Sequence, residues 1–208
     1  AFVAKQVADN RDRAQAWHFA FGLDRWFVDQ AADDQRIVDE VLRFGGNVCF
    51  TNESHQSGTD RCAEVLSRLG ETVDYVVNIQ GDEPLVNPNQ LDALLSAFND
   101  PVVQIATLGS PNISVDDLNN PNRIKIVTNA FGNALYFSRS AVPNDFHFKG
   151  NAHAFYPFLK HIGLYAYRKS CLLELILLEP SKLEQVESLE QLRRLYYGYS
   201  IRVIETSI

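Results

Sequence analysis

Two adjacent carboxylates follow an apolar run in the stretch Asp74 to Leu85, which reads DYVVNIQGDEPL. The run Tyr75 to Ile79 predicts a buried strand, and Gln80 to Pro84 predicts a tight turn at its carboxyl end. In open α/β sheets, ligands bind just outside the carboxyl ends of the strands. Asp82 in that turn is therefore a candidate ligand for Mg²⁺, a hard cation that shares oxygen ligands with substrate phosphates. A solvated turn, in which Gly81 provides backbone freedom, is the alternative.

A second group of polar residues, His55 to Arg61 (HQSGTDR), lies where a loop is expected to lead into a helix. Small hydroxyls and a glycine at such a junction leave backbone N–H groups open to an anion or a planar base. The alternative is an ordinary helix start, in which Thr59 caps a helix that runs to Leu69. Spacing alone favours the helix cap over the ligand site.

Two later segments place polar side chains at or along expected strands. Arg139 follows the expected strand Ala134–Ser138, and its guanidinium can bind a carboxylate or a phosphate through two parallel hydrogen bonds. A surface ion pair is the alternative. In the expected strand His161–Tyr167, the side chains of His161 and Tyr165 share one polar face. This face is either a solvated edge of the sheet or the wall of a pocket.

The stretch Ser181 to Tyr197 predicts one amphipathic helix, because apolar residues recur on one face at helical spacing. Its other face is partly polar and carries Glu184, Glu187, Glu190 and Gln191. We expect most of these side chains to be solvated and one or two of them to contact a ligand.

The composition is that of an ordinary globular protein of 208 residues, of which 46% are hydrophobic and 22% are charged. The formal net charge of −7 does not favour nucleic acid, so an anionic substrate needs local cationic side chains or a metal. Apolar runs are too short for a transmembrane helix, and we expect no signal peptide, because the first residues given do not show its basic-then-apolar pattern. Cys49, Cys62 and Cys171 show no metal-ligand spacing, and reduced thiols in a cytoplasmic protein are the simplest interpretation.

Expected strands and helices alternate along the chain, which predicts an α/β fold with a mostly parallel mixed sheet and helices on both faces. The turn Phe131–Asn133 between two expected strands adds a hairpin and a small antiparallel extension. We expect a single domain over residues 1–208. The expected strands are Trp26–Gln30, Asn47–Phe50, Tyr75–Ile79, Gln104–Leu108, Arg123–Thr128, Ala134–Ser138, His161–Tyr167 and Ile201–Ile204; the expected helices are Asp33–Phe44, Thr59–Leu69, Asn87–Phe98 and Ser181–Tyr197.

The segments HQSGTDR, VNIQGDEPL, ALYFSRS, KHIGLYAYR and ESLEQLR in combination resemble the 3-deoxy-manno-octulosonate cytidylyltransferase (CMP-Kdo synthetase) family. The resemblance extends from about Asp33 to Val203. It implies a three-layer, Rossmann-like nucleotidyltransferase fold. It also implies transfer of CMP from CTP to the acid sugar 3-deoxy-D-manno-octulosonate (Kdo), giving CMP-Kdo and pyrophosphate for lipopolysaccharide biosynthesis. Members of the family use Mg²⁺ and are typically homodimers, and we expect the same here.

The resemblance also implies roles for individual residues. Asp82 matches the magnesium-binding aspartate, and with Arg139, which lies near the sugar acid, it forms the expected catalytic pair. The expected nucleotide-binding residues are His55, Ser57, Gly58, Thr59 and Arg61, and the expected sugar-binding residues are Gln80, Arg139, His161, Tyr165, Glu190 and Gln191.

Both ends of the chain depart from the family. The family begins with a strand and a basic glycine-rich loop of the type PAR..S.R.PGKPL, and Ala1 to Arg25 contains nothing similar. The family also continues into a GVDTPEDL-like segment with a second metal-binding aspartate, and Ile208 precedes it. Methionine is absent from the chain. We therefore expect the chain to be incomplete at both ends and, expressed alone as written, to make no CMP-Kdo.

Two other functions stay open at this point. One is a cytidylyltransferase for another acid sugar, such as sialic acid, although KHIGLYAYR and ESLEQLR argue against it. The other is a non-catalytic relative that binds a nucleotide sugar, which the missing basic loop would favour.

Overall fold

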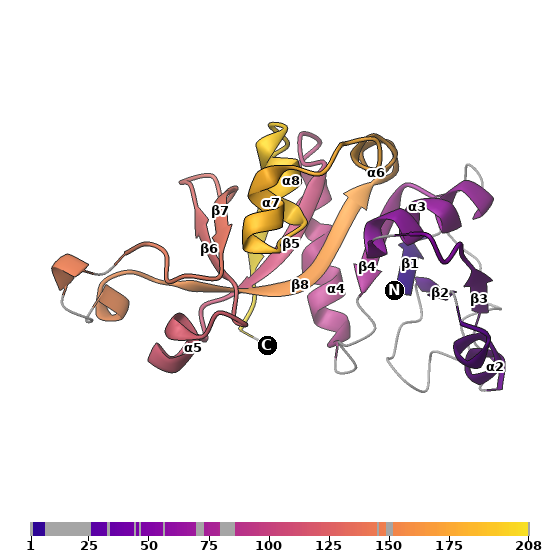
Figure 1. Cartoon of the computed structure of the whole chain (residues 1–208), viewed down its shortest axis with the longest axis horizontal. Coiled ribbons are helices and arrows are strands. Elements are labelled where there is room, and N and C mark those ends of the chain that lie inside the picture. The colour runs from indigo at the N-terminus through magenta and orange to yellow at the C-terminus, as the bar shows by residue number, and fades with distance from the viewer. Residues whose placement is uncertain are drawn as a thin grey trace. The chain divides into compact units, whose positions relative to one another are not determined.

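The computed structural model describes residues 2–6, 26–32, 34–43, 45, 47–55, 57–69, 73–79, 86–144, 146–148 and 152–207 (Figure 1). The chain divides into two compact units, each assembled from separate stretches. Unit 1 comprises residues 1–92 and 164–177, and unit 2 comprises residues 93–163 and 178–208. The predicted turn Gln80–Leu85, which contains Asp82, lies outside the described residues.

Unit 1 contains a sheet with the strand order β3-β2-β1-β4-β8. β2 pairs with β3 in parallel, whereas β1 pairs antiparallel with both β2 and β4, and β4 pairs antiparallel with the second half of β8. The strands are β1 (Phe2–Gln6), β2 (Trp26–Ala32), β3 (Asn47–Phe50), β4 (Tyr75–Ile79) and β8 (Leu159–Arg168).

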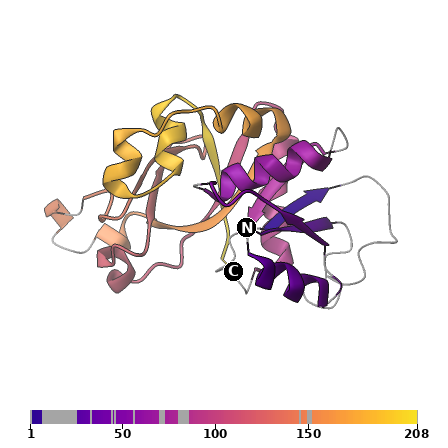
Figure 2. The same cartoon turned by 45° about the vertical axis from the view of Figure 1, so that its right-hand side comes forward.

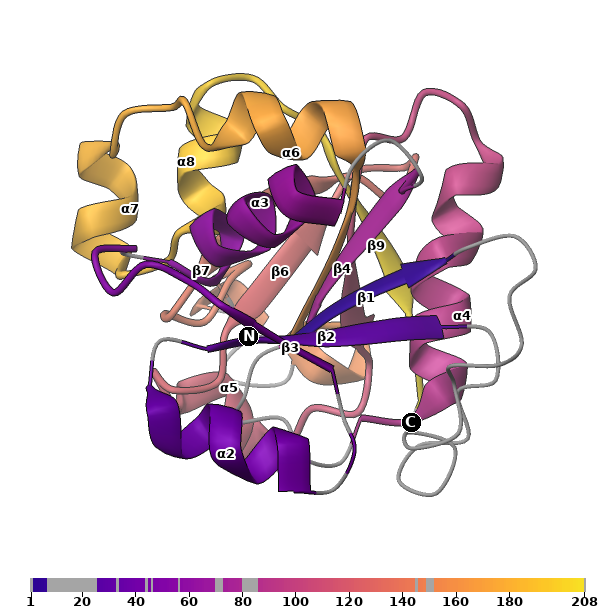
Figure 3. The ribbon, with the colours of Figure 1, turned by 90° about the vertical axis from the view of Figure 1, so that its right-hand side faces the viewer.

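Helices cover both faces of the sheet in unit 1. α3 (Gly58–Leu69) and α6 (Lys169–Leu175) lie on one side of the strands and α2 (Gln35–Arg43) on the other (Figure 3). α2 buries Val38 and Val41, which lie one turn apart, whereas its apolar residues Ile37 and Leu42 are 42% and 58% exposed. It ends before Gly45, whose φ of 79° is a conformation that glycine adopts without steric cost.

Unit 2 contains the strand order β8-β5-β9, in which β5 (Ile105–Ser110) pairs in parallel with β9 (Ile201–Glu205). β5 is buried along its whole length, as expected for a strand covered on both faces. β6 (Lys125–Thr128) and β7 (Ala134–Ser138) form the predicted antiparallel hairpin, and β6 also pairs with the first half of β8.

The helices of unit 2 are short. α5 (Val115–Asn119) begins with a capping box formed by Ser114 and Asp117. α7 (Lys182–Glu187) and α8 (Gln191–Tyr196) contact each other, as the golden ribbons in Figure 2 show. Helical 3₁₀ turns occur at Ala97–Asn99, Phe146–Phe148 and Ala152–Ala154. α4 (Pro88–Ser96) begins in unit 1 and ends in unit 2.

The structure confirms the predicted α/β fold with a mixed sheet and helices. Antiparallel pairings take a larger part than expected, because β1 and β8 run against β4. β1, α5 and α6 were not predicted. None of the helices in the described residues is long and apolar enough to cross a membrane.

The prediction of one helix over Ser181–Tyr197 is wrong. The helix breaks at Ser188, which has the left-handed backbone conformation with φ 52°. In a continuous helix, the carbonyl oxygens of Glu187 and Ser188 would accept from N–H groups four residues further along. Here both accept from the guanidinium of Arg139 instead, at 2.6 Å and 3.1 Å. A contact from a distant strand therefore overrides the helical periodicity of the sequence.

Candidate functional site

The loop-to-helix junction before α3 is closed by Ser57 and not by Thr59, so the predicted cap is wrong by two residues. The Oγ of Ser57 accepts the backbone N–H of Asp60 at 3.1 Å and donates to Oδ2 of Asp60 at 2.8 Å. Ser57 thus satisfies an N–H group that the first helical turn leaves open. Gly58 is the first residue of α3, and Thr59 is 3% exposed, which leaves its side chain in the core.

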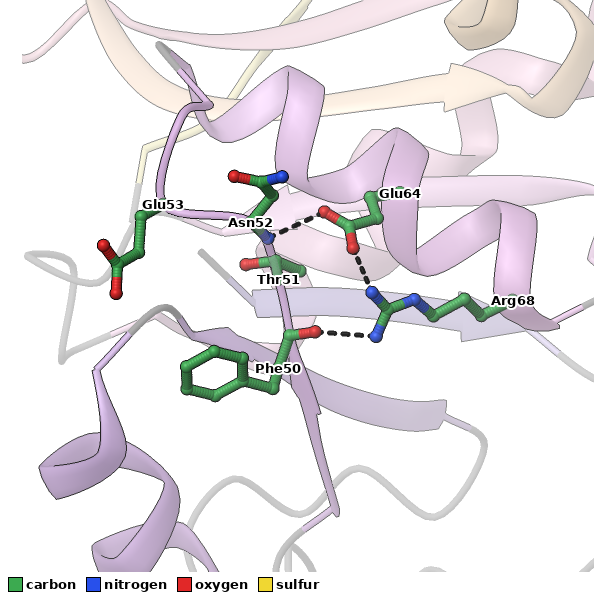
Figure 4. A pocket seen from close by; sticks show the side chains of 6 residues that line it. All are labelled: Phe50, Thr51, Asn52, Glu53, Glu64 and Arg68. Carbon is green, nitrogen blue, oxygen red and sulfur yellow. Dashed lines mark hydrogen bonds and ion pairs between the residues drawn. The ribbon is translucent and has the colours of Figure 1, made fainter.

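A hollow of about 370 Å³ lies beside this junction in unit 1 (Figure 4). Glu64 on α3 accepts the backbone N–H of Asn52 at 2.9 Å and contacts Nε2 of His55 at 2.5 Å. These two hydrogen bonds lower the pKa of Glu64, the bond from Asn52 most of all. Arg68 pairs with Glu64 and donates to the carbonyl of Phe50 at 2.6 Å. The hollow is lined by Phe50, Thr51, Asn52, Glu53, Glu64 and Arg68.

Two of the predicted nucleotide-binding side chains, His55 and Arg61, connect the loop after β3 to α3 through hydrogen bonds. His55 is held by Glu64, and Arg61 donates to the hydroxyl of Thr51 at 3.0 Å. Both contacts tie the residues that follow β3 to α3. These contacts hold His55 and Thr51 against α3 in unit 1, and the role of His55–Arg61 toward a nucleotide stays a prediction.

His161 on β8 carries a neutral imidazole. Its Nε2 lies 3.0 Å from Oγ1 of Thr107, and its ring packs edge-on against Phe137 with the centroids 5.3 Å apart. Desolvation, assisted by the positive charge of Arg194, lowers the pKa of His161 to about 3. A neutral imidazole can donate a hydrogen bond to a sugar hydroxyl or accept one from it, but it has no positive charge to bind a sugar carboxylate.

Arg139 supplies a positive charge at the end of β7. Its guanidinium donates to the carbonyl oxygens of Glu187 at 2.6 Å, Pro121 at 3.0 Å and Ser188 at 3.1 Å. A guanidinium carries five N–H groups, and among the described residues three of them have these acceptors, whereas two have none. All three of these acceptors are backbone carbonyl oxygens, so these contacts are not the surface ion pair that was the alternative interpretation of Arg139.

The acidic residues of α7 are not solvated as expected. Glu184 is 8% exposed and holds the guanidinium of Arg193 through two bonds of 2.6 Å and 2.7 Å. It also forms a capping box with Ser181 at the start of α7. The carboxylate of Glu187 accepts from the hydroxyl of Ser138, the last residue of β7, and from the backbone N–H of Arg139, which follows it. Both glutamates thus have structural contacts that the polar helix face did not reveal.

Four of the predicted sugar-binding residues lie in unit 2, namely Arg139, His161, Glu190 and Gln191. Neighbouring residues connect them. Arg139 binds the turn at Ser188, which leads directly to Glu190 and Gln191. Arg194 is close enough to lower the pKa of His161, and it also donates to Glu190 at 2.8 Å. Gln191 is 6% exposed.

Tyr165, the fifth described residue of the predicted sugar-binding set, lies in unit 1, is 5% exposed and stacks on Tyr167 at a centroid distance of 6.1 Å. Opposite Tyr165 in the register of β4 and β8 lies Asn78, which the sequence reasoning missed. Asn78 is 5% exposed, and its Oδ1 accepts no hydrogen bond from the described residues. The signal was present in the sequence as an amide inside the otherwise apolar run Tyr75–Ile79.

The predicted metal ligand cannot be placed, because Gln80 and Asp82 lie outside the described residues. Among the residues that the structure describes, no three His, Cys, Asp or Glu side chains group as a metal site. The assignment of Asp82 to Mg²⁺ thus stays a prediction from the sequence.

The mixed sheet with its covering helices agrees with the nucleotidyltransferase fold that the sequence predicted. Residues 23–203 match the family described as Cytidylyltransferase, and the chain belongs to this family. The resemblance found in the sequence is thereby confirmed.

Individual relatives agree with this family. A 3-deoxy-manno-octulosonate cytidylyltransferase from Bacteroides thetaiotaomicron is 49% identical over 185 residues, covering 83% of this chain and 71% of the relative. The protein of the same name from Aliivibrio fischeri is 45% identical over 185 residues, covering 88% and 74%. A solved structure of CMP:2-keto-3-deoxy-manno-octonic acid synthetase complexed with CTP has a TM-score of 0.78 and 39% identity, covering 86% of this chain and 71% of that one.

Proposed function

We propose that the protein transfers CMP from CTP to Kdo, giving CMP-Kdo and pyrophosphate in the lipopolysaccharide pathway. The observation that carries this proposal is the 45–49% identity to proteins named 3-deoxy-manno-octulosonate cytidylyltransferase, over more than four fifths of the chain. The presence of five characteristic segments supports it. The CTP complex of the similar solved structure supports CTP as the nucleotide.

The reaction asks for positioning and charge neutralisation more than for covalent chemistry. The anomeric hydroxyl of Kdo attacks the α-phosphorus of CTP, and pyrophosphate leaves. Both substrates are anionic, and the protein carries a net charge of −7, so a local cation must offset the repulsion. Arg139 is the residue for this task, because two of its guanidinium N–H groups have no acceptor among the described residues and can bind the sugar carboxylate. His161, held neutral, suits a hydroxyl of the sugar.

We propose Mg²⁺ as the cofactor and Asp82 as its ligand, because carboxylate oxygens near substrate phosphates are typical of magnesium sites. A bound Mg²⁺ would polarise the phosphate oxygens. We further propose a homodimer on the basis of the family resemblance, and a cytoplasmic location on the basis of the cysteine spacing.

The test is pyrophosphate release by the full-length protein with CTP, Kdo and Mg²⁺, with CMP-Kdo identified by mass spectrometry. Replacing Kdo with sialic acid is the matched control for the sugar. Turnover with sialic acid and none with Kdo would select the other acid-sugar enzyme. Calorimetric binding of CTP with no turnover on either sugar would select the non-catalytic relative.

A further inference from the structure

Glu187 stands at the centre of a hydrogen-bonded corner in unit 2, which consists of Tyr136, Ser138, Arg139, Glu187 and Ser188. The carboxylate of Glu187 accepts the hydroxyl of Ser138 at 2.9 Å, the backbone N–H of Arg139 at 3.0 Å and the hydroxyl of Tyr136 at 3.3 Å. The guanidinium of Arg139 returns to the carbonyl oxygens of Glu187 and Ser188. The end of β7 and the end of α7 are therefore joined by two sets of hydrogen bonds: one set ends on the carboxylate of Glu187, and the other starts from the guanidinium of Arg139.

A buried lysine fixes the same corner from the side of β6. Lys125 is 0% exposed, and its Nζ donates to the carbonyl oxygens of Arg139, Arg123 and Asn120. Burial lowers the pKa of Lys125, while the negative charge of Glu187 opposes that shift. Arg139 is thus held at its backbone N–H, at its carbonyl and at its guanidinium.

The corner decides the conformation of the segment that follows α7. The sequence from Ser181 to Tyr197 has the periodicity of one continuous helix, and that helix is the competing conformation. The left-handed backbone conformation of Ser188 is unfavourable for a residue other than glycine, so other contacts must offset its cost. The two charge-assisted hydrogen bonds from Arg139 stabilise this conformation.

We propose that Glu187 is a positioning residue for the acid sugar, acting through Arg139 and through the turn at Ser188. Its carboxylate orients Arg139 toward the sugar carboxylate. It also maintains the helix break at Ser188, so that Glu190 and Gln191 lie at the start of a new helix and not in the middle of a continuous one. This inference rests on the proposed function, because it takes Arg139, Glu190 and Gln191 as the residues that meet the sugar.

The variant Glu187→Gln tests the proposal, because it keeps the size of the side chain and places an N–H₂ group against at least one of the three donors. We expect the KM for Kdo to rise by at least about tenfold and the KM for CTP to stay within about twofold. Glu179→Gln, which removes an equal charge from an exposed position in unit 2, should leave both values unchanged. A parallel rise in both KM values would overturn a role toward the sugar.

A double variant separates positioning from general stability. Since Glu187 acts through Arg139, adding Glu187→Gln to Arg139→Ala should raise the KM for Kdo little beyond Arg139→Ala alone. Fully additive losses would show that Glu187 acts elsewhere. Should Glu187→Gln fold poorly, Ser138→Ala removes a single donor to Glu187 and should show a smaller shift in the same direction.

Amide hydrogen exchange of the protein without substrates measures the local stability of this corner independently of turnover. The amide of Arg139 donates to Glu187, so Glu187→Gln should speed its exchange and that of the segment Ser188–Gln191. Unchanged exchange at both places would overturn the inference. Absence of turnover by the unaltered protein with any acid sugar would instead overturn the proposed function, and with it the sugar role of the corner.

Discussion

Nε2 of His161 lies 3.0 Å from Oγ1 of Thr107, which links β8 to β5 inside unit 2. The histidine ring is desolvated, and Arg194 adds a repulsive positive charge, so its pKa falls from the ordinary value of 6.5 to about 3. The imidazole therefore stays neutral across the range in which histidines ordinarily titrate.

This neutral histidine predicts a pH dependence of stability. Between pH 6.5 and about 3, the unfolded chain binds a proton at His161 that the folded chain does not bind. The free energy of unfolding should therefore decrease as the pH falls through this window, and the full contribution of His161 should be present above it. Urea unfolding at pH 7.5, 6 and 5 should show a weaker dependence in His161→Gln. His147→Gln, at an exposed position, is the control. An equal slope in both variants would contradict the prediction.

Asp82→Asn should abolish turnover of the full-length protein while it leaves the fold intact. The amide keeps the shape of the side chain but loses the charge that a magnesium ligand provides. Pyrophosphate release measures the loss, and circular dichroism checks the fold. Asp74→Asn, which alters an exposed carboxylate just before the same strand, is the matched control. Near-normal turnover in Asp82→Asn would remove Asp82 from the metal role.

The pair formed by Glu184 and Arg193 should stabilise the protein only as long as both partners are present. Their side chains are 10% and 19% exposed, so either charge without its partner is largely desolvated. We expect Glu184→Leu or Arg193→Met alone to lower the free energy of unfolding by about 3 kcal/mol. The double variant should lose less than the sum of the two. Strict additivity in chemical unfolding would show that the pair is not coupled.

Ser188→Gly should raise the stability slightly. Glycine relieves the cost of the left-handed conformation, about 1–2 kcal/mol, but loses roughly 0.5–1 kcal/mol through its more flexible unfolded chain. The net gain of about 0.5 kcal/mol corresponds to a melting temperature about 1–2 °C higher. Ser188→Val should lower the melting temperature, because a β-branched side chain tolerates this conformation poorly. A lower melting temperature for Ser188→Gly would contradict the prediction.

The strongly patterned elements could be predicted from the sequence, among them β4, α3, α4 and the hairpin of β6 and β7. The break at Ser188 could not be predicted, because the apolar period continues across it and the cause is Arg139, which lies 49 positions away. The cap at Ser57 carried a readable signal, a serine three residues before Asp60, but Thr59 was preferred to it.

For the candidate site, the combination of segments predicted the family. The residues that hold these segments in place were not recognised for this role, because the role depends on contacts made far along the chain. Glu187 was assigned to a mostly solvated helix face, and Lys125 was not singled out, until the structure showed what they bind. Asn78 differs from them, since its place in an apolar strand was visible but was not interpreted.

The interleaving of the two units affects how the protein is made. Unit 1 needs residues 164–177 to complete its sheet, so a nascent chain cannot finish it until most of unit 2 has been synthesised. Two of the passages between the units fall inside α4 and β8 rather than in loops. Neither unit is thus a continuous stretch of coding sequence that could be expressed, exchanged or duplicated as a cassette, and the two units must be inherited together.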